Sequence, residues 1–244
     1  MSERGAAPLE HGHSREEIRQ RLSADPIQSY LRDWVYGGID GAVTTFAVAA
    51  GVAGASLSPQ IVLILGFANL LADGFSMAVA NYSGTQTERE QYERLIAIEH
   101  KHIAAVPDGE REEIRQIFAK KGFQGEELES VVKTISADEG GWAQTMVLEE
   151  YGLAPLVRSP VIAALCTFGA FALFGSIPLI PYLAGGGLLA SATATSVAFL
   201  LIGSLKSRWS VRSAWRSGLE TLVIGGVAAG LAFATGHVLA SLLS

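Results

Sequence analysis

The chain has one cysteine, Cys166, among its 244 residues. A single cysteine excludes an intrachain disulfide, and nothing in this usage implies an oxidising compartment. The sequence also lacks a Walker phosphate loop, a CxxC pair and the spacing of a catalytic Ser-His-Asp triad. An apolar h-region is missing from the N-terminus, so no cleavable signal peptide is expected. We therefore expect neither a nucleotide-driven pump nor an enzyme, and no catalytic residues.

Charge is nearly absent from five long stretches, although the whole chain holds 18 basic and 24 acidic residues. Each stretch supplies the roughly 20 apolar residues that a helix needs to cross a bilayer. The sequence therefore predicts an all-α membrane protein with five transmembrane helices. Their expected ranges are 34–57, 60–83, 160–182, 184–205 and 217–242.

Glycine is abundant in these stretches, with 27 in the chain. Small residues let membrane helices approach closely. The pairs Gly37/Gly41 and Gly226/Gly230 have the spacing of such a contact, and spacing alone does not say which pair is used.

The charged residues divide the chain into four parts. Residues 1–33 form a tail in which Ser14 and Glu17 predict a capping box, opening a short amphipathic helix at the membrane surface. Residues 34–83 hold the first two spans, and residues 84–157 form a small helical insert between spans two and three. Residues 158–244 hold the last three spans.

Basic residues set the expected orientation, because they concentrate in cytosolic loops. All of them lie in the tail, in the insert with its junction at Arg158, or in the loop 206–216. With five spans, the tail, the insert and the loop 206–216 can all lie on one side of the membrane. The tail and the insert should therefore be cytosolic, and the C-terminus should lie on the far side. The net charge of −6 shows no nucleic-acid-binding patch.

Two carboxylates lie well inside the first two spans, Asp40 and Asp73. A charge at this depth costs at least ~2.5–3.5 kcal/mol and usually faces a partner or a polar path. Helical spacing puts Asp40 and Thr44 on one face of the first span. It also puts a row of residues four apart on one face of the second span: Asn69, Asp73, Met77 and Asn81. We predict a transport path lined by Asp40, Thr44, Asn69, Asp73 and Met77, with Asn81 continuing the second row. Adding a thioether to oxygen ligands favours a transition metal over Mg²⁺ or Ca²⁺.

The insert carries further candidate ligands. No proline interrupts the chain from span two until Pro107, which predicts one long helix leaving the bilayer. Glu99 and His102 form the Glu-x-x-His pair used by di-iron helical bundles. A solvated charged face would explain an isolated pair equally well. The expected metal ligands are Glu88, Glu99, His102, Met146, Glu149 and Glu150.

The motifs "DGAVTTFAVAAGVAGA" and "ADGFSMAVANYSGTQTERE", an acidic helical insert and three further spans resemble the vacuolar iron transporter family. The resemblance covers residues 30 to 243. It implies a five-span homodimer with the metal path at the subunit interface. It also implies export of Fe²⁺, sometimes Mn²⁺, from the cytosol in exchange for protons.

The family's transport aspartate and methionine match Asp40 and Met77. Glu88, Glu99, Met146 and Glu150 fall where the family's insert places metal ligands. His102 and Asn69 stand at positions where the family has acidic residues.

We therefore expect a proton-coupled exporter of Fe²⁺, with Mn²⁺, Co²⁺ and Zn²⁺ as alternative substrates and no permanently bound cofactor. Its expected partners are membrane lipid and a second copy of the chain. It would lie in the inner membrane of a bacterium or the vacuolar membrane of a eukaryote. The leading alternative is a membrane-anchored iron-binding or iron-sensing protein, in which the spans only anchor and dimerise. A ferroxidase using Glu99 and His102 ranks third.

Overall fold

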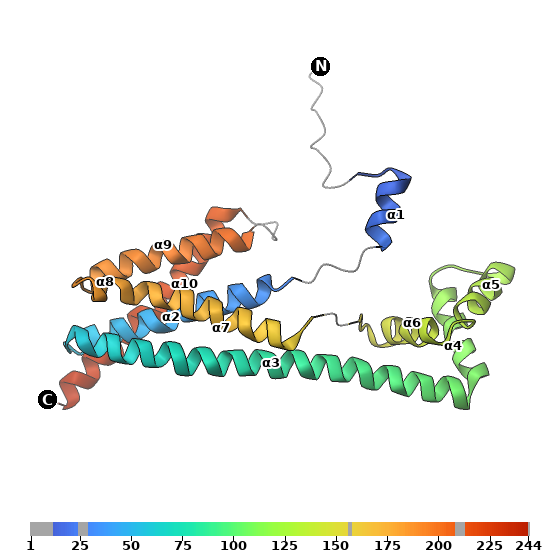
Figure 1. Cartoon of the computed structure of the whole chain (residues 1–244), viewed down its shortest axis with the longest axis horizontal. Helices are drawn as coiled ribbons and strands as arrows, with labels where there is room; N and C mark the ends of the chain where they lie inside the picture. Colours follow the sequence, from blue (N-terminus) through green and yellow to red (C-terminus); the bar gives the residue numbers. More distant parts are fainter. Residues whose placement is uncertain (1–11, 24–28, 156–157, 208–212, 244) are drawn as a thin grey trace, which may run out of the picture.

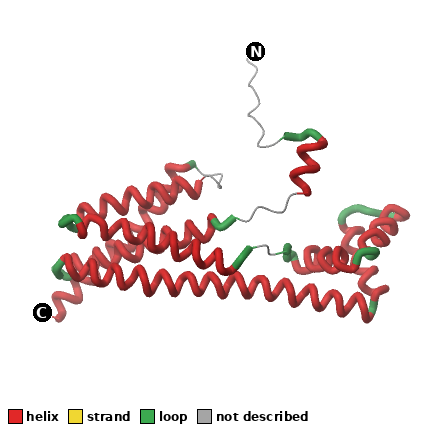
Figure 2. Tube along the Cα trace, viewed as in Figure 1, coloured by secondary structure: helices red, strands yellow, loops and turns green. Residues whose placement is uncertain are grey.

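The computed structural model describes residues 12–23, 29–155, 158–207 and 213–243. Within these ranges every regular element is a helix (Figure 2). The elements are α1 Arg15–Ser23, α2 Leu31–Gly54, α3 Pro59–Ala105, α4 Pro107–Lys120, α5 Gly125–Ile135, α6 Glu139–Tyr151, α7 Pro160–Ser176, η1 Ile177–Leu179, α8 Ile180–Leu183, α9 Leu188–Ser207 and α10 Ala214–Leu243.

Five helical segments among the described residues are long and apolar enough to cross a membrane. They are α2, α3, the run α7–η1–α8, α9 and α10, so the prediction of five spans is confirmed. The third span changes to a 3₁₀ turn at Ile177–Leu179, where Pro178 removes a backbone donor. The first span, α2, begins at Leu31 and not at residue 34 as predicted, which brings Asp33 into the span.

Helix α3 is the longest element and joins the two parts of the molecule (Figure 1). Its 47 residues rise about 70 Å at 1.5 Å per residue, more than twice the roughly 30 Å hydrocarbon core. The predicted continuous helix is confirmed, and it ends at Ala105, just before Pro107. The half after residue 83 therefore projects beyond the apolar segment and carries the insert.

Helix α2 lies at the centre of the spans and packs on α3, α7, α9 and α10. Gly37 and Gly41 permit the contact with α7, because a Cβ at Gly41 would lie 2.4 Å from the carbonyl oxygen of Phe171. At Gly226 and Gly230, no atom of the described residues outside the local backbone of α10 lies within 4 Å of such a Cβ. The first glycine pair is thus the one used for helix contact within the described chain.

The insert folds back on the far end of α3 as three short helices, α4, α5 and α6. They enclose an apolar cluster of Ile103, Ile114, Val132, Trp142 and Met146. Helix α4 begins at Pro107, because proline is well tolerated in a first helical turn.

Helix α1 starts with the predicted capping box. The Ser14 backbone N–H donates to Glu17 Oε2 over 3.1 Å, and the Glu17 N–H donates to Ser14 Oγ over 3.3 Å. The sequence predicts that Asp25-Pro26 ends this helix, because proline interrupts helices, and these two residues lie outside the described ranges. Attachment of α1 to a membrane surface stays a prediction.

Candidate functional site

Of the five predicted path residues, two line a common pocket beside the contact of α2 and α3, and Thr44, Asn69 and Asp73 are not among its lining residues. Asp40 on α2 and Met77 on α3 line one open pocket of about 800 Å³, together with Arg32, Tyr36 and Lys206. Asp73 lies close enough to Asp40 for the two carboxylates to repel each other. The pocket therefore presents carboxylate oxygen and thioether sulfur to one space between two apolar helices.

Thr44 and Asn69 bridge the same two helices. The Thr44 hydroxyl donates to the Asp40 carbonyl oxygen over 2.8 Å and accepts a hydrogen bond from Asn69 Nδ2 over 3.3 Å. The hydroxyl thus bonds the backbone of Asp40 and not its carboxylate, as a threonine inside a helix commonly does. With its nitrogen committed to Thr44, Asn69 has its amide oxygen to offer a cation.

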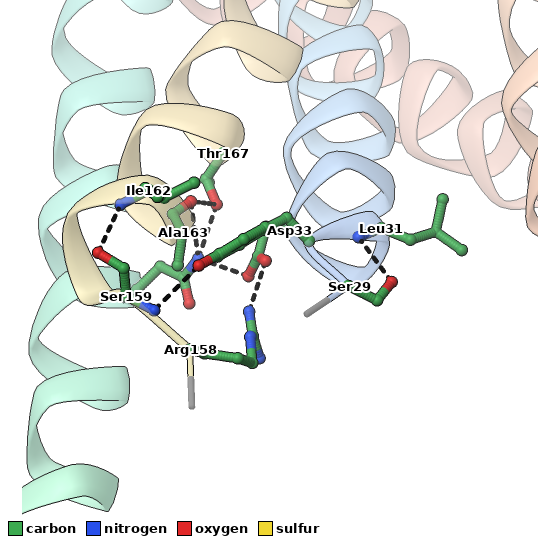
Figure 3. A network of polar contacts seen from close by, with 10 residues as sticks. Ser29, Leu31, Asp33, Arg158, Ser159, Ile162, Ala163 and Thr167 are labelled. Atoms are coloured by element: carbon green, nitrogen blue, oxygen red, sulfur yellow. Dashed lines mark hydrogen bonds and ion pairs between the residues drawn. The ribbon is translucent and has the colours of Figure 1, made fainter. Parts of the chain in front are cut away.

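Asn81, the last member of the row on α3, takes part in a different contact. It belongs to the network around Asp33, Arg158 and Thr167 that Figure 3 shows. Its Nδ2 donates to Asp33 over 2.9 Å and to the Thr167 hydroxyl over 2.7 Å. Asp33 is 2% exposed and also pairs with Arg158 at the start of α7. The Arg158 guanidinium lies over the Tyr30 ring. This network ties α2, α3 and α7 together at the end of the path nearest the insert.

Asp33 was assigned to the tail from sequence, and its burial was missed. Two signals could have found it. Asp33 precedes Asp40 by seven residues, which is two helical turns on one face. Arg158 is the one basic residue at the start of the third span.

Replacing Asp33 by asparagine should destabilise the protein by about 3 kcal/mol, the lower end of the range for breaking a buried ion pair. The lower end applies because the Arg158 side chain is still 22% exposed. The measurement is thermal unfolding of the detergent-solubilised chain. Asp33→Asn with Arg158→Gln should recover much of the loss, because no charge is then left without a partner. A double variant as unstable as the single one would contradict the pairing.

The insert brings a second set of ligand groups together from three helices. We call this set the insert cluster: Glu99 and His102 on α3, Glu110 and Glu113 on α4, and Glu150 on α6. Ligand atoms of Glu99, His102 and Glu110 all lie within 4.8 Å of one another. His102 Nδ1 is 3.7 Å from Glu110 Oε1. The carboxylates of Glu113 and Glu150 both interact electrostatically with the carboxylate of Glu99.

Two carboxylates of the insert cluster are buried, each with one oxygen that lacks a hydrogen-bond partner among the described residues. Glu99 is 1% exposed and Glu110 is 4% exposed. Glu99 Oε1 and Glu110 Oε2 have no hydrogen-bond partner among the described residues. Burial, and next the negative charges of Glu110 and Glu150, raise the pKa of Glu99, and His102 offsets part of this rise. Burial followed by the same two carboxylates also raises the pKa of Glu113. A divalent cation would supply the missing positive charge and the missing partner atoms.

Glu110 and Glu113 were not among the ligands predicted from sequence. Their position depends on the turn at Pro107, which sends α4 back along α3. Ile114 is fully buried in the insert core, so Glu110, one turn earlier, points inward as well. The signal in the sequence was the carboxylate spacing i, i+3 followed directly by an isoleucine.

Three predicted ligands take other positions. Glu88 is exposed on α3 and precedes Glu99 by eleven residues, about 16 Å along the helix axis. Glu149 forms an ion pair with Lys121. Met146 is fully buried among the apolar residues of the insert, one turn from Glu150. The described chain thus brings Glu99, His102 and Glu150 into the insert cluster and leaves Glu88 outside it.

Known proteins resemble this chain over nearly its whole length. The model of the VIT family matches residues 31–237. "Vacuolar iron transporter 1" of Oryza sativa subsp. japonica is 31% identical over 228 residues, covering 91% of this chain and 89% of that protein. "Vacuolar iron transporter 1" of Arabidopsis thaliana is 33% identical over 213 residues, covering 85% of each. "Vacuolar iron transporter" of Toxoplasma gondii is 31% identical over 86% of this chain and 74% of that protein.

Proposed function

The chain belongs to the VIT family, and from that premise we propose that it transports divalent iron out of the cytosol in exchange for protons. The insert cluster would collect the ion on the cytosolic side. The path between α2 and α3 would then carry it across the membrane. Mn²⁺, Co²⁺ and Zn²⁺ are alternative substrates of the same chemistry.

One observation carries this proposal: Asp40 and Met77 line one pocket, and Asp73 interacts with Asp40, within the apolar parts of α2 and α3. An intramembrane charge is costly and marks ion and proton pathways. A membrane anchor would not need it. This favours transport over the alternative of an anchored iron-binding or iron-sensing protein.

The same pair of carboxylates supports the exchange with protons. A carboxylate can hold a proton while the path is empty, and a neighbouring cation favours its ionised form. An entering metal ion therefore displaces the protons, which leave toward the cytosol, the side from which the ion comes. Protons from the far side then reload the carboxylates after the ion has left. Asp40 and Asp73 would be the groups that alternate between proton and metal.

We further propose that two copies of the chain form a homodimer within the lipid. Large apolar side chains are exposed along the spans, including Phe75 on α3 and Val223, Val227 and Leu231 on α10. Such faces must meet lipid or another apolar helix. The distribution of basic residues supports a cytosolic location for the tail and the insert, with the C-terminus on the far side.

The test is metal flux into proteoliposomes that contain the purified chain and an acidic interior. We expect Fe²⁺ to enter while a pH dye reports loss of internal protons, and we expect protein-free vesicles to do neither. A panel of Mn²⁺, Co²⁺, Zn²⁺ and Ca²⁺ would define selectivity. Metal binding to the purified chain without any flux would favour the anchored iron-binding protein.

A further inference from the structure

His102 is the one imidazole of the insert cluster, whose other four members are carboxylates. The side chain of His102 is 49% exposed, so the ring approaches the buried carboxylates of Glu99 and Glu110 from the solvent side. His102 and Glu99 are three residues apart on the uninterrupted helix α3, which fixes their spacing. An ion bound between the buried carboxylates would therefore meet one nitrogen ligand in addition to oxygens.

The kind of ligand decides which metals a site favours. Carboxylate oxygens suit Mg²⁺, Ca²⁺ and Mn²⁺, whereas imidazole nitrogen suits iron, nickel, copper and zinc. Affinity generally rises from Mn²⁺ through Fe²⁺ and Co²⁺ to Ni²⁺ and Cu²⁺. Exchanging one oxygen ligand for an imidazole thus strengthens binding of the later metals more than binding of Mn²⁺.

We propose that His102 determines the metal preference of the insert, by giving the insert cluster one nitrogen ligand that favours Fe²⁺, Co²⁺ and Zn²⁺ over Mn²⁺. The inference rests on the proposed function and deepens it, because it concerns which ions the insert collects. The competing role for His102 is that of a cationic partner of Glu110, which would stabilise the empty insert and would not discriminate between metals.

The experiment measures Co²⁺, Zn²⁺ and Mn²⁺ affinities of the full-length chain in detergent, by calorimetry at one fixed pH near neutrality. Binding by the insert is defined as the part that is lost in Glu99→Gln/Glu110→Gln. His102→Asn removes the imidazole, and His102→Glu replaces it with a fifth carboxylate. The matched control is His100→Asn, since His100 lies on the same helix but pairs with Glu139, outside the insert cluster.

We expect His102→Asn to lower the Co²⁺ affinity by at least about tenfold, the lower end of what losing even an outer partner costs a metal site. The Mn²⁺ affinity should fall less, so the Co²⁺-to-Mn²⁺ affinity ratio should fall as well. His102→Glu should lower the same ratio while keeping Mn²⁺ binding, and His100→Asn should leave it unchanged.

Two results would overturn the inference. An unchanged ratio in His102→Asn and His102→Glu would show that the imidazole is not a ligand. Equal loss of Co²⁺ and Mn²⁺ affinity would assign His102 a role in stability or charge only. If instead the wild-type insert bound none of the three metals, the collecting role in the proposed function would fail as well.

Discussion

Replacing Glu99 and Glu110 together by glutamine should abolish metal binding by the insert and should also stabilise the metal-free protein. Both side chains are buried, and each has a carboxylate oxygen without a partner among the described residues. Glutamine keeps the shape but removes two negative charges that repel each other. The affinity of the insert should fall by more than about 100-fold, because losing even outer partners of a metal site costs up to that much.

The pH dependence of stability provides an independent signature. The pKa of Glu99 and the pKa of Glu113 are raised in the folded protein by burial and by neighbouring carboxylates. The folded state therefore binds more protons than the unfolded state between the ordinary and the raised pKa values. Stability of the metal-free protein must then fall as the pH rises through that window. Above the window the loss is complete, and a bound divalent cation should reverse it.

The measurement is thermal unfolding in a chelator from mildly acidic to neutral pH, followed by tryptophan fluorescence, to which Trp142 in the insert core contributes. The wild type should lose stability toward neutral pH, and the double variant should lose less. Glu126→Gln/Glu127→Gln is the matched control, because it removes two exposed charges from the first turn of α5. A double variant that unfolds at a lower temperature than the wild type at neutral pH would show that the two carboxylates are not strained in the empty insert.

The long helix α3 and the position of Asp40 inside a span could be predicted because their causes are local. No proline occurs between Pro59 and Pro107, so nothing in the sequence stops α3. Asp40 stands out because the residues around it are almost all apolar. In both cases the prediction depends only on residues close to one another in the sequence.

Asn81 shows where periodicity alone is insufficient. A repeat of four residues advances about 400° around a helix, which is about 40° beyond a full turn. From Asn69 to Asn81 the drift is therefore about 120°. Asn69 thus faces Thr44 on α2, whereas Asn81 reaches Asp33 and Thr167. The residues form one row in the sequence, but the two ends of this row form hydrogen bonds with different residues.

The insert cluster could be predicted only in part because it depends on a chain reversal. Glu99 and His102 share one helix, so their spacing is visible in the sequence. Glu110 and Glu113 join them only because α4 turns back at Pro107 and buries Ile114. The angle between two helices is set by packing, which no local pattern of residues contains.

Replacing Asp40 by asparagine should reduce metal-for-proton exchange to the level of protein-free vesicles while leaving the fold intact. Asparagine is close to aspartate in size, but it neither titrates nor brings a negative charge to a cation. The contact between α2 and α3 should survive, because Thr44 bonds the backbone carbonyl of Asp40 and not its carboxylate. Asp40→Glu should keep partial transport, since the carboxylate remains and only its reach changes.

The measurement is Fe²⁺ uptake into vesicles with an acidic interior, recorded together with an internal pH dye. Glu220→Gln is the matched control, because Glu220 is a carboxylate in a span, on α10, that does not line the pocket of Asp40 and Met77. It should transport like the wild type. Asp73→Asn removes the second carboxylate of the path and should weaken the link between metal entry and proton loss. If Asp40→Asn moved iron and protons at the wild-type rate, Asp40 would be a structural residue, and the pocket between α2 and α3 could not be the route of the ion.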